Sequence, residues 1–433
     1  MNLSDHVAPN EPLLAPVLRL PAKYERNGLP LSMHGNPLLE ALRFTKDAKE
    51  YLVALSGKPD IDLDASRSQD PLARIYDLRA LKQLFVPYPN GAMFARAIDV
   101  AVRDAYADRN PFNPAAVADL YSTAEILRAQ SADQDPQYGG IFLEGMSGMG
   151  KTRLIRRILS MYPQAIVHAN YSGRAYHQTQ VVWLSVTAPV AGSLKGLMLS
   201  LMRHRDRAAG VEGTAAALYP QYAGKKLASV EVMLDAFCAA AASDQLGILH
   251  IDDFQRVAES RANRVMILQF IINLSNAVKC PILFSGTPAT LELLKNEKDQ
   301  NALETARRLC SSGHFKLRRP ASHEDPFFGV LAAALFKYQW VDKPLALDDT
   351  LLRTLYELTA GLPSVLTFLH RAAQRRVLES GKGALTVEDY GATWTEELGM
   401  LHRPLQALIK MNPGAEAQFE AVMRKVAGDL LAK

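Results

Sequence analysis

Residues 140–154 read Gly-Ile-Phe-Leu-Glu-Gly-Met-Ser-Gly-Met-Gly-Lys-Thr-Arg-Leu, and the predicted fold is built outward from this segment. An apolar run at 141–143 precedes a glycine-rich loop ending in Lys151 and Thr152, and apolar residues at helical spacing follow. This strand–loop–helix pattern is typical of a phosphate-binding loop. Glycines let backbone N–H groups surround phosphate oxygens, and the positive end of the helix dipole faces the same oxygens. We therefore predict nucleotide binding here, the alternative being a chance glycine turn before a helix.

The predicted nucleotide-binding residues form one continuous run. They are Gly145, Met146, Ser147, Gly148, Met149, Gly150, Lys151, Thr152 and Arg153. In such loops the lysine reaches the β- and γ-phosphates and the hydroxyl that follows it binds Mg²⁺. The expected cofactors are therefore ATP and Mg²⁺, with Lys151 also acting in catalysis and Thr152 as a metal ligand.

A second motif lies about a hundred residues downstream, where an apolar run at 246–251 ends in Asp252 and Asp253. A carboxylate at this place in a P-loop ATPase holds the Mg²⁺ shell, and the next one orients the attacking water as a general base. We predict these roles for Asp252 and Asp253 respectively. The alternative is a buried strand that ends in an aspartate turn.

A third apolar run, 281–287, ends in Thr287 just before Pro288. Ligands bind beyond the carboxyl ends of parallel strands, so Thr287, or less favourably Ser285, is placed to position the attacking water. A helix cap before the proline is the competing interpretation, and one residue can serve both purposes.

Arg307 and Arg308 end a predicted helix just before a short strand at 314–317. One of them is predicted to stabilise charge at the nucleotide of a neighbouring subunit. Arginines near a helix C-terminus are also favourable with the helix dipole alone, which is the simpler explanation.

The predicted fold class is α/β: a parallel sheet flanked by helices, with a β-hairpin insertion, a small all-α lid and a helical N-terminal region. Five segments are expected: a proline-rich arm at 1–37, a helical region at 38–137, the ATPase core at 138–321, the lid at 322–400 and a helical tail at 401–433. Apolar residues between 37 and 55 recur at helical spacing. Strands at 164–170 and 178–186 would form the hairpin, and Ser193 would cap the helix that follows.

The bulk composition is that of an ordinary globular protein, with 48% hydrophobic and 22% charged residues among 433. No apolar stretch approaches the length of about 18 residues needed to cross a membrane, and the first residues lack a secretion signal. A cytoplasmic protein without a membrane partner is expected. The 3 cysteines lack metal-type spacing, so neither a disulfide framework nor a zinc site is expected.

In their order along the chain, the phosphate loop, Asp-ended strand, hydroxyl-ended strand, arginine pair and helical lid resemble those of AAA+ ATPases. Within these, the sequence over about residues 80–320 resembles the TnsC/TniB-type regulators of DNA transposition. The segments that carry this resemblance are Tyr106-Ala-Asp-Arg-Asn-Pro111, His168-Ala-Asn-Tyr171-Ser-Gly173, Gln180-Val-Val-Trp-Leu184 and Pro189-Val-Ala-Gly-Ser-Leu-Lys-Gly196.

The resemblance implies an ATP-dependent protein that assembles with itself, as rings or helical filaments, around duplex DNA. It would link a target-selector protein to the transposase, and ATP hydrolysis would disassemble the polymer. Lys151, Thr152 and Asp252 match the family's nucleotide site. Asp253 replaces the usual glutamate, so slow hydrolysis is expected, and Ser364 stands where many AAA+ proteins have a phosphate-sensing arginine.

Polymer geometry in that family would place loops of the core near DNA. The candidate DNA-binding residues are Arg174, Ser193, Lys195, Lys225 and Lys226. They would contact phosphates without reading base sequence, and the alternative is ordinary solvated charge.

Two other functions remain open at this point. A nucleotide-switched signalling or scaffold ATPase that works without DNA is compatible with the weak net charge of +4. A small-molecule P-loop kinase is the third possibility, and the predicted lid and arginine pair argue against it.

Overall fold

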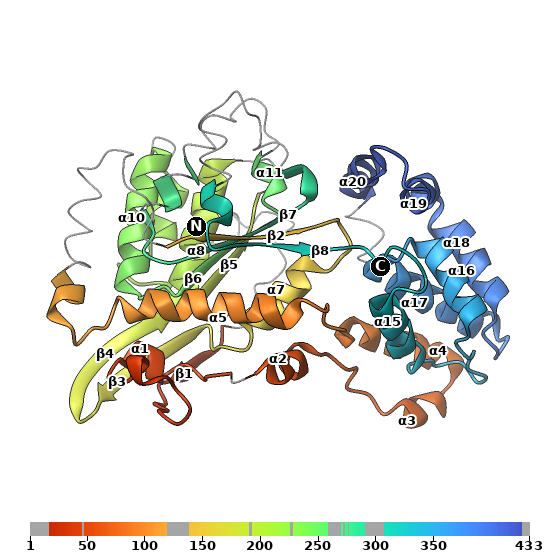
Figure 1. Ribbon diagram of the computed structural model, residues 1–433, viewed down its shortest axis with the longest axis horizontal. Coiled ribbons are helices and arrows are strands. Elements are labelled where there is room, and N and C mark those ends of the chain that lie inside the picture. Colours follow the sequence, from red (N-terminus) through yellow and green to blue (C-terminus); the bar gives the residue numbers. More distant parts are fainter. Residues whose placement is uncertain are drawn as a thin grey trace.

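The computed structural model describes residues 17–45, 47–118, 138–189, 193–225, 228–258, 270–271, 273–275, 277–290 and 307–426. Residues 1–16 of the predicted arm, Lys226 and the end of the tail lie outside the described residues. An α/β core and a helical lid lie side by side, and the long helix α5 (Gly91–Ala107) runs beneath the sheet (Figure 1).

The main sheet has five parallel strands in the order β5-β6-β7-β2-β8. They are β2 (Gly140–Gly145), β5 (Trp183–Thr187), β6 (Ile248–Asp252), β7 (Ile282–Gly286) and β8 (Gly313–Leu317). Because parallel strands end at one edge, the phosphate loop and the polar residues after β6 and β7 gather there. The predicted α/β fold with a parallel sheet is confirmed.

Helices pack on both faces of this sheet. Ile141 and Leu143 of β2 belong to the core formed with α5 and α7 (Lys151–Leu159), whereas Phe142 belongs to the core formed with α8 (Leu194–Ala209) and α10 (Val230–Ser243). Successive strand residues point to opposite faces, so burial of both faces requires the continuous apolar runs seen in the sequence.

A second, three-stranded sheet lies beneath α5 (Figure 1). Its strands are β1 (Arg19–Pro21), β3 (Ala165–Tyr171) and β4 (Arg174–Val181). β3 and β4 form the predicted antiparallel hairpin, and β1 pairs parallel to β3. The single strand predicted over 178–186 is wrong, because the chain leaves the hairpin at Val182 and enters the main sheet as β5. The apolar run through this point has no break in pattern that would mark the crossing.

The lid is all-α, as predicted, and consists of α15 (Pro326–Phe336), α16 (Asp349–Thr359), α17 (Pro363–Ser380) and α18 (Val387–Glu397). A 3-10 turn (Gly399–Leu401) then leads to α19 (His402–Ile409) and α20 (Ala415–Val426). Buried side chains of α19 and α20 join the same hydrophobic cluster as the lid. Within the part of the chain that the structure describes, no helix has the length and apolar character of a membrane span.

Before α5, the N-terminal region contains short helices rather than one long one. They are η2 (Leu31–Met33), α1 (Pro37–Glu40), α2 (Ala48–Leu55), α3 (Leu63–Arg67), α4 (Pro71–Asp77) and η3 (Leu78–Gln83). The helical spacing predicted over 37–55 is interrupted, because Asn36 caps α1 and Asp47 caps a separate α2. Arg74 of α4 pairs with Asp342 at 2.6 Å, so this region also packs on the lid. Two short helices of the core, α9 (Tyr219–Ala223) and α11 (Gln255–Ala258), complete the described elements.

Candidate nucleotide-binding site

The loop between β2 and α7 has the backbone of an anion-binding turn. Gly148 and Gly150 have φ angles of +84° and +83°, a region that side chains disfavour. A Cβ atom on Gly148 would also overlap Ser364 Oγ. Gly150 caps α7 without a side-chain hydrogen bond, which leaves backbone N–H groups at the positive end of the helix available to an anion.

Lys151 lies inside this loop and is buried. Its Nζ donates hydrogen bonds to the carbonyl oxygens of Gly145, at 2.7 Å, and Met146, at 3.2 Å. Burial lowers the pKa of Lys151, while the carboxylates of Glu420, Asp253 and Asp252 act in the opposite direction. An ammonium group therefore sits beside the loop among acidic groups.

The two predicted Mg²⁺ ligands meet although they are 100 residues apart in the sequence. Thr152 Oγ1, on α7, donates to Asp252 Oδ2, at the end of β6, over 2.7 Å. The other carboxylate oxygen of Asp252 accepts the Asp253 N–H at 3.0 Å and the Ser285 hydroxyl. Burial alone would raise the pKa of Asp252, but His250 and these donors hold it below its ordinary value. An ionised carboxylate next to a hydroxyl is a suitable pair of oxygen ligands for Mg²⁺.

A row of polar side chains that local sequence patterns do not predict crosses the sheet next to Asp252. His250 Nδ1 is 2.8 Å from Ser185 Oγ on β5, and its Nε2 is 3.2 Å from Ser285 Oγ on β7. Burial lowers the pKa of His250 to about 4, so the ring is neutral at neutral pH. The Ser285 hydroxyl contacts His250 and Asp252, so it serves to orient Asp252. Thr287, buried just beyond β7, stays the candidate for positioning water.

Asp253, the predicted general base, is held in an ion pair. Its carboxylate is 2.8 Å from Arg256 Nη2 and accepts a hydrogen bond from Gln255 Nε2 at 3.1 Å. The backbone of Asp253 has a φ of +52°, which is uncommon for residues other than glycine. Its catalytic role therefore requires a change of partner from Arg256 to water, and it stays a prediction.

The lid contributes directly to the loop through Ser364. Its backbone N–H donates to the Gly148 carbonyl oxygen at 3.1 Å. Its hydroxyl oxygen is buried and has no hydrogen-bond partner among the described residues. The position where the family resemblance leads one to expect an arginine thus holds a small hydroxyl that touches the phosphate loop.

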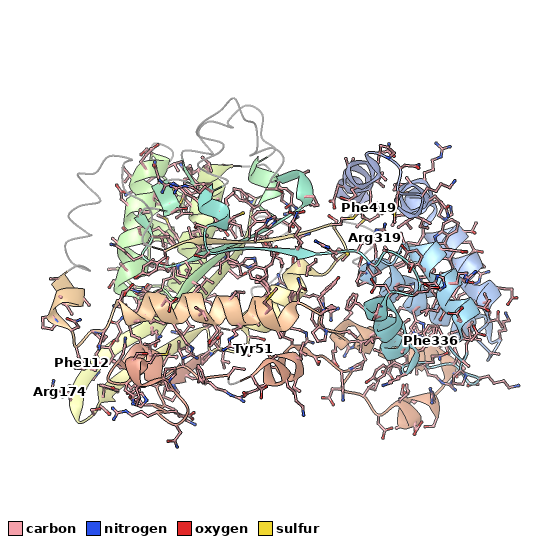
Figure 2. All side chains as sticks on the ribbon, in the orientation of Figure 1. Tyr51, Phe112, Arg174, Arg319, Phe336 and Phe419 are labelled. Atoms are coloured by element: carbon pink, nitrogen blue, oxygen red, sulfur yellow. The ribbon has the colours of Figure 1, made fainter. Side chains whose placement is uncertain are left out.

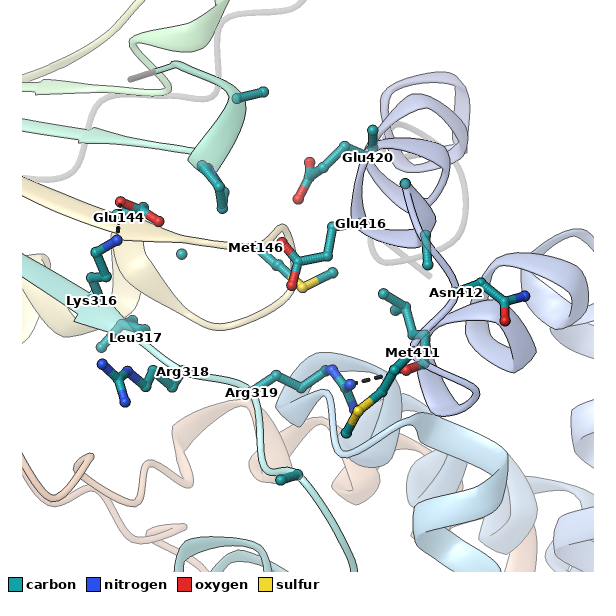
Figure 3. Close-up of a pocket in the computed structure, with 18 residues that line it drawn as sticks. Glu144, Met146, Lys316, Leu317, Arg318, Arg319, Met411, Asn412, Glu416 and Glu420 are labelled. Carbon is teal, nitrogen blue, oxygen red and sulfur yellow. Dashed lines mark hydrogen bonds and ion pairs between the residues drawn. The ribbon is translucent and has the colours of Figure 1, made fainter. Parts of the chain in front are cut away.

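A cavity of about 670 Å³ opens between the loop, the end of β8 and the C-terminal helices (Figure 3). Its lining includes Met146, Arg318, Arg319, Glu416 and Glu420. This volume is within the range of about 300–1,000 Å³ typical of small-molecule sites. The two arginines were not predicted, because nothing in the local pattern after β8 marks them as lining a cavity.

Other predicted residues lie at the margin of this site. Arg153 points away from the cavity, since its Nη2 donates to the carbonyl oxygens of Lys82, at 2.6 Å, and Leu84, at 2.9 Å. Of the arginine pair, Arg307 is exposed and Arg308 is buried, with only 3% of its surface accessible. Only Arg307 therefore has the exposure that contact with a neighbouring subunit requires.

The predicted DNA contacts divide into two places. Arg174 is exposed at the tip of the β3–β4 hairpin, at the end of the molecule remote from Arg319 (Figure 2). Ser193 caps α8 as predicted, its hydroxyl accepting the Gly196 N–H at 3.1 Å. Lys195 Nζ donates to the carbonyl oxygen of Lys225 at 2.7 Å, so these two residues lie together near the start of α8.

The sequence of residues 135–294 matches the family described as AAA domain. No curated protein matches the chain. Among solved structures, the Aeropyrum pernix Orc1 protein in complex with DNA shares 14% identity, covers 73% of this chain and 83% of its own, and has a TM-score of 0.42.

Two Thermotoga maritima structures are similar to a comparable degree. Domain III of the replication initiation protein DnaA has 12% identity, covers 72% of this chain and 98% of its own, and gives a TM-score of 0.36. The RuvB Holliday junction branch migration motor has 13% identity, covers 73% of this chain and 84% of its own, and gives a TM-score of 0.36. Likeness at this level says nothing about function. The family match over residues 135–294 and the arrangement of strands, loop and lid together show that the chain has the AAA+ P-loop fold.

Proposed function

We propose that this protein is an ATPase that uses ATP and Mg²⁺ to control its own assembly on duplex DNA during transposition. The observation that carries the proposal is the contact of Thr152 with Asp252 at the mouth of the phosphate loop. A hydroxyl and an ionised carboxylate at this place fit Mg²⁺, and the loop already holds an anion, because the Ser147 N–H donates to the carboxylate of Glu420 at 2.6 Å.

Each residue of the site then has a distinct role. ATP with Mg²⁺ supplies the phosphoanhydride, and Lys151 and the loop N–H groups bind and neutralise its phosphates. Asp253 accepts a proton from the attacking water after leaving Arg256, and Thr287 positions that water. Arg307 stabilises charge at the nucleotide site of the adjacent subunit. It is assigned this role in place of Arg308 because Arg307 is exposed and Arg308 is buried. The shorter reach of aspartate compared with glutamate makes hydrolysis slow.

The DNA part of the proposal rests on the sequence resemblance. Two of the four segments that carry it build the hairpin and the crossing into β5. The hairpin is braced by Tyr24, whose hydroxyl is 2.8 Å from His168 Nδ1 and whose ring lies 4.9 Å from that of Tyr171. A braced hairpin presents Arg174 at a fixed position. Arg174, the group at the start of α8 (Ser193, Lys195 and Lys225) and Lys226 contact DNA phosphates.

The partners that follow are duplex DNA, further copies of the chain, a transposase and a target-selector protein. Electron microscopy of the protein with a non-hydrolysable ATP analogue and duplex DNA, at low salt, tests the proposal. Rings or filaments should form only when nucleotide and DNA are both present. Their absence would contradict it. Assemblies that need nucleotide but not DNA would support the scaffold ATPase, which the net charge of +4 favours.

A further inference from the structure

A carboxylate of the chain itself occupies the phosphate loop. Glu420, on α20, accepts the backbone N–H of Ser147 at 2.6 Å through Oε1 and the Ser147 hydroxyl at 2.6 Å through Oε2. Only 3% of Glu420 is exposed. Both carboxylate oxygens thus use donors of a loop whose backbone and helix dipole are arranged to hold an anion.

This contact competes with phosphate for the same groups. The Ser147 N–H belongs to the loop whose backbone N–H groups would cradle nucleotide phosphates, and here it is already bonded to Glu420. Lys151 is turned to the carbonyl oxygens of Gly145 and Met146. A second carboxylate of α20, that of Glu416, lines the same cavity one turn earlier (Figure 3). The two carboxylates that α20 presents to the cavity therefore add electrostatic repulsion of phosphate to the occupation of the loop.

The helix that carries Glu420 is anchored on the lid. Ala415, Phe419 and Met423 of α20 are buried in the cluster that contains Leu405 and Leu408 of α19. Arg319, just after β8, donates to the carbonyl oxygens of Leu408, at 3.0 Å, and Ala360, at 2.8 Å. Glu420 is thus a polar contact from a lid-anchored helix to the core loop.

We propose that α20 competes with nucleotide for the phosphate loop. Glu420 takes the place of a phosphate in the nucleotide-free protein, and ATP binding displaces α20 from the loop. This inference rests on the proposed nucleotide site and adds its regulation. The position of the C-terminal helix then differs between the nucleotide-free and nucleotide-bound protein. Only molecules in which α20 is withdrawn bind ATP. The apparent Kd for ATP therefore equals the intrinsic Kd divided by the fraction of such molecules.

Two variants of Glu420 in the full chain test this competition. Glu420→Gln removes the charge and keeps one oxygen that can accept the Ser147 N–H, whereas Glu420→Ala removes both hydrogen bonds. Charge-assisted hydrogen bonds are roughly twice as strong as neutral ones, so both variants should bind a fluorescent ATP analogue more tightly. We expect Kd to fall at least about tenfold for Glu420→Ala, equivalent to about 1.4 kcal/mol, and less for Glu420→Gln.

Glu416→Gln is the matched charge control. It lies on the same helix and lines the same cavity, and its change in Kd should stay below about threefold because screened charge without a hydrogen bond contributes little. An equal gain from Glu416→Gln and Glu420→Gln would overturn the proposal, since general repulsion would then explain the effect. Hydrogen exchange gives a second measurement: saturating ATP should raise exchange in residues 415–423 of the wild-type protein, and unchanged exchange there would contradict displacement.

The outcomes separate this inference from the proposed function. If the wild-type protein and Glu420→Ala bind nucleotide with the same Kd, the competition is refuted and the nucleotide site stands. If circular dichroism shows both to be folded and neither binds nucleotide at millimolar concentration, the proposed function fails and this inference fails with it.

Discussion

Acidification should destabilise this protein through His250, whose ring is fully buried between Ser185 and Ser285. Burial lowers the pKa of His250 from 6.5 to about 4. The unfolded chain therefore binds a proton below pH 6.5 that the folded chain does not bind until about pH 4, and stability falls as the pH falls through this window. Between pH 7.5 and pH 5 the loss is about 2 kcal/mol, and it approaches about 3 kcal/mol near pH 4.

His250→Gln removes this titration while keeping a side chain that can donate and accept hydrogen bonds. Urea unfolding followed by circular dichroism at pH 7.5 and pH 5 should show that the variant loses about 2 kcal/mol less than the wild-type protein. His370, buried in the lid with its pKa also lowered to about 4, is an internal reference. The corresponding His370→Gln variant should show a similar difference.

Two results would refute this reasoning. One is an equal loss of stability on acidification in His250→Gln and the wild-type protein. The other is an NMR titration in which the His250 ring takes up its proton near pH 6.5. Either would mean that the imidazole is not buried between the two hydroxyls, and the orientation of Asp252 through Ser285 would then lose its support.

Two further predictions concern the chemistry of the site. Ser285→Ala removes the hydroxyl that donates to Asp252 and contacts His250, so nucleotide affinity in the presence of Mg²⁺ should fall about tenfold, as is usual for residues that orient metal ligands. Titration of a fluorescent nucleotide with and without Mg²⁺ measures this loss, and an equal loss of affinity in both conditions would contradict it. Asp253→Asn removes the proposed base, so phosphate release should stop while DNA-bound assemblies persist in ATP; unchanged turnover would show that Asp253 is not the base.

The conformation of the glycine-rich loop and the contact between Thr152 and Asp252 were predictable because the residues that form them lie in short, contiguous patterns. Lys151 and Thr152 follow the glycines directly, and Asp252 ends an apolar strand. Parallel strands must end at one edge, so contact between Thr152 and Asp252 follows from topology once the strands are recognised. The lid helices were predictable for a similar reason, since amphipathic periodicity is a local property.

Three features could not be read from local pattern. The crossing at Val182 lies inside a continuous apolar run, where both sheets require the same residue types. The row from Ser185 to Ser285 depends on the register between three strands, which period-2 alternation does not specify when both faces are buried. The contact of Glu420 with Ser147 joins residues 273 positions apart and involves one polar residue on an otherwise ordinary helix.

Nucleotide-dependent DNA binding is the most direct test of the central claim. Fluorescence anisotropy of a labelled duplex should be measured at low salt with the wild-type protein and Lys151→Ala, each with and without a non-hydrolysable ATP analogue. The account predicts a large gain in affinity on adding nucleotide to the wild-type protein and no gain for Lys151→Ala, because the loop lysine is needed to bind the phosphates. Equal affinity of the wild-type protein for DNA with and without nucleotide would contradict it.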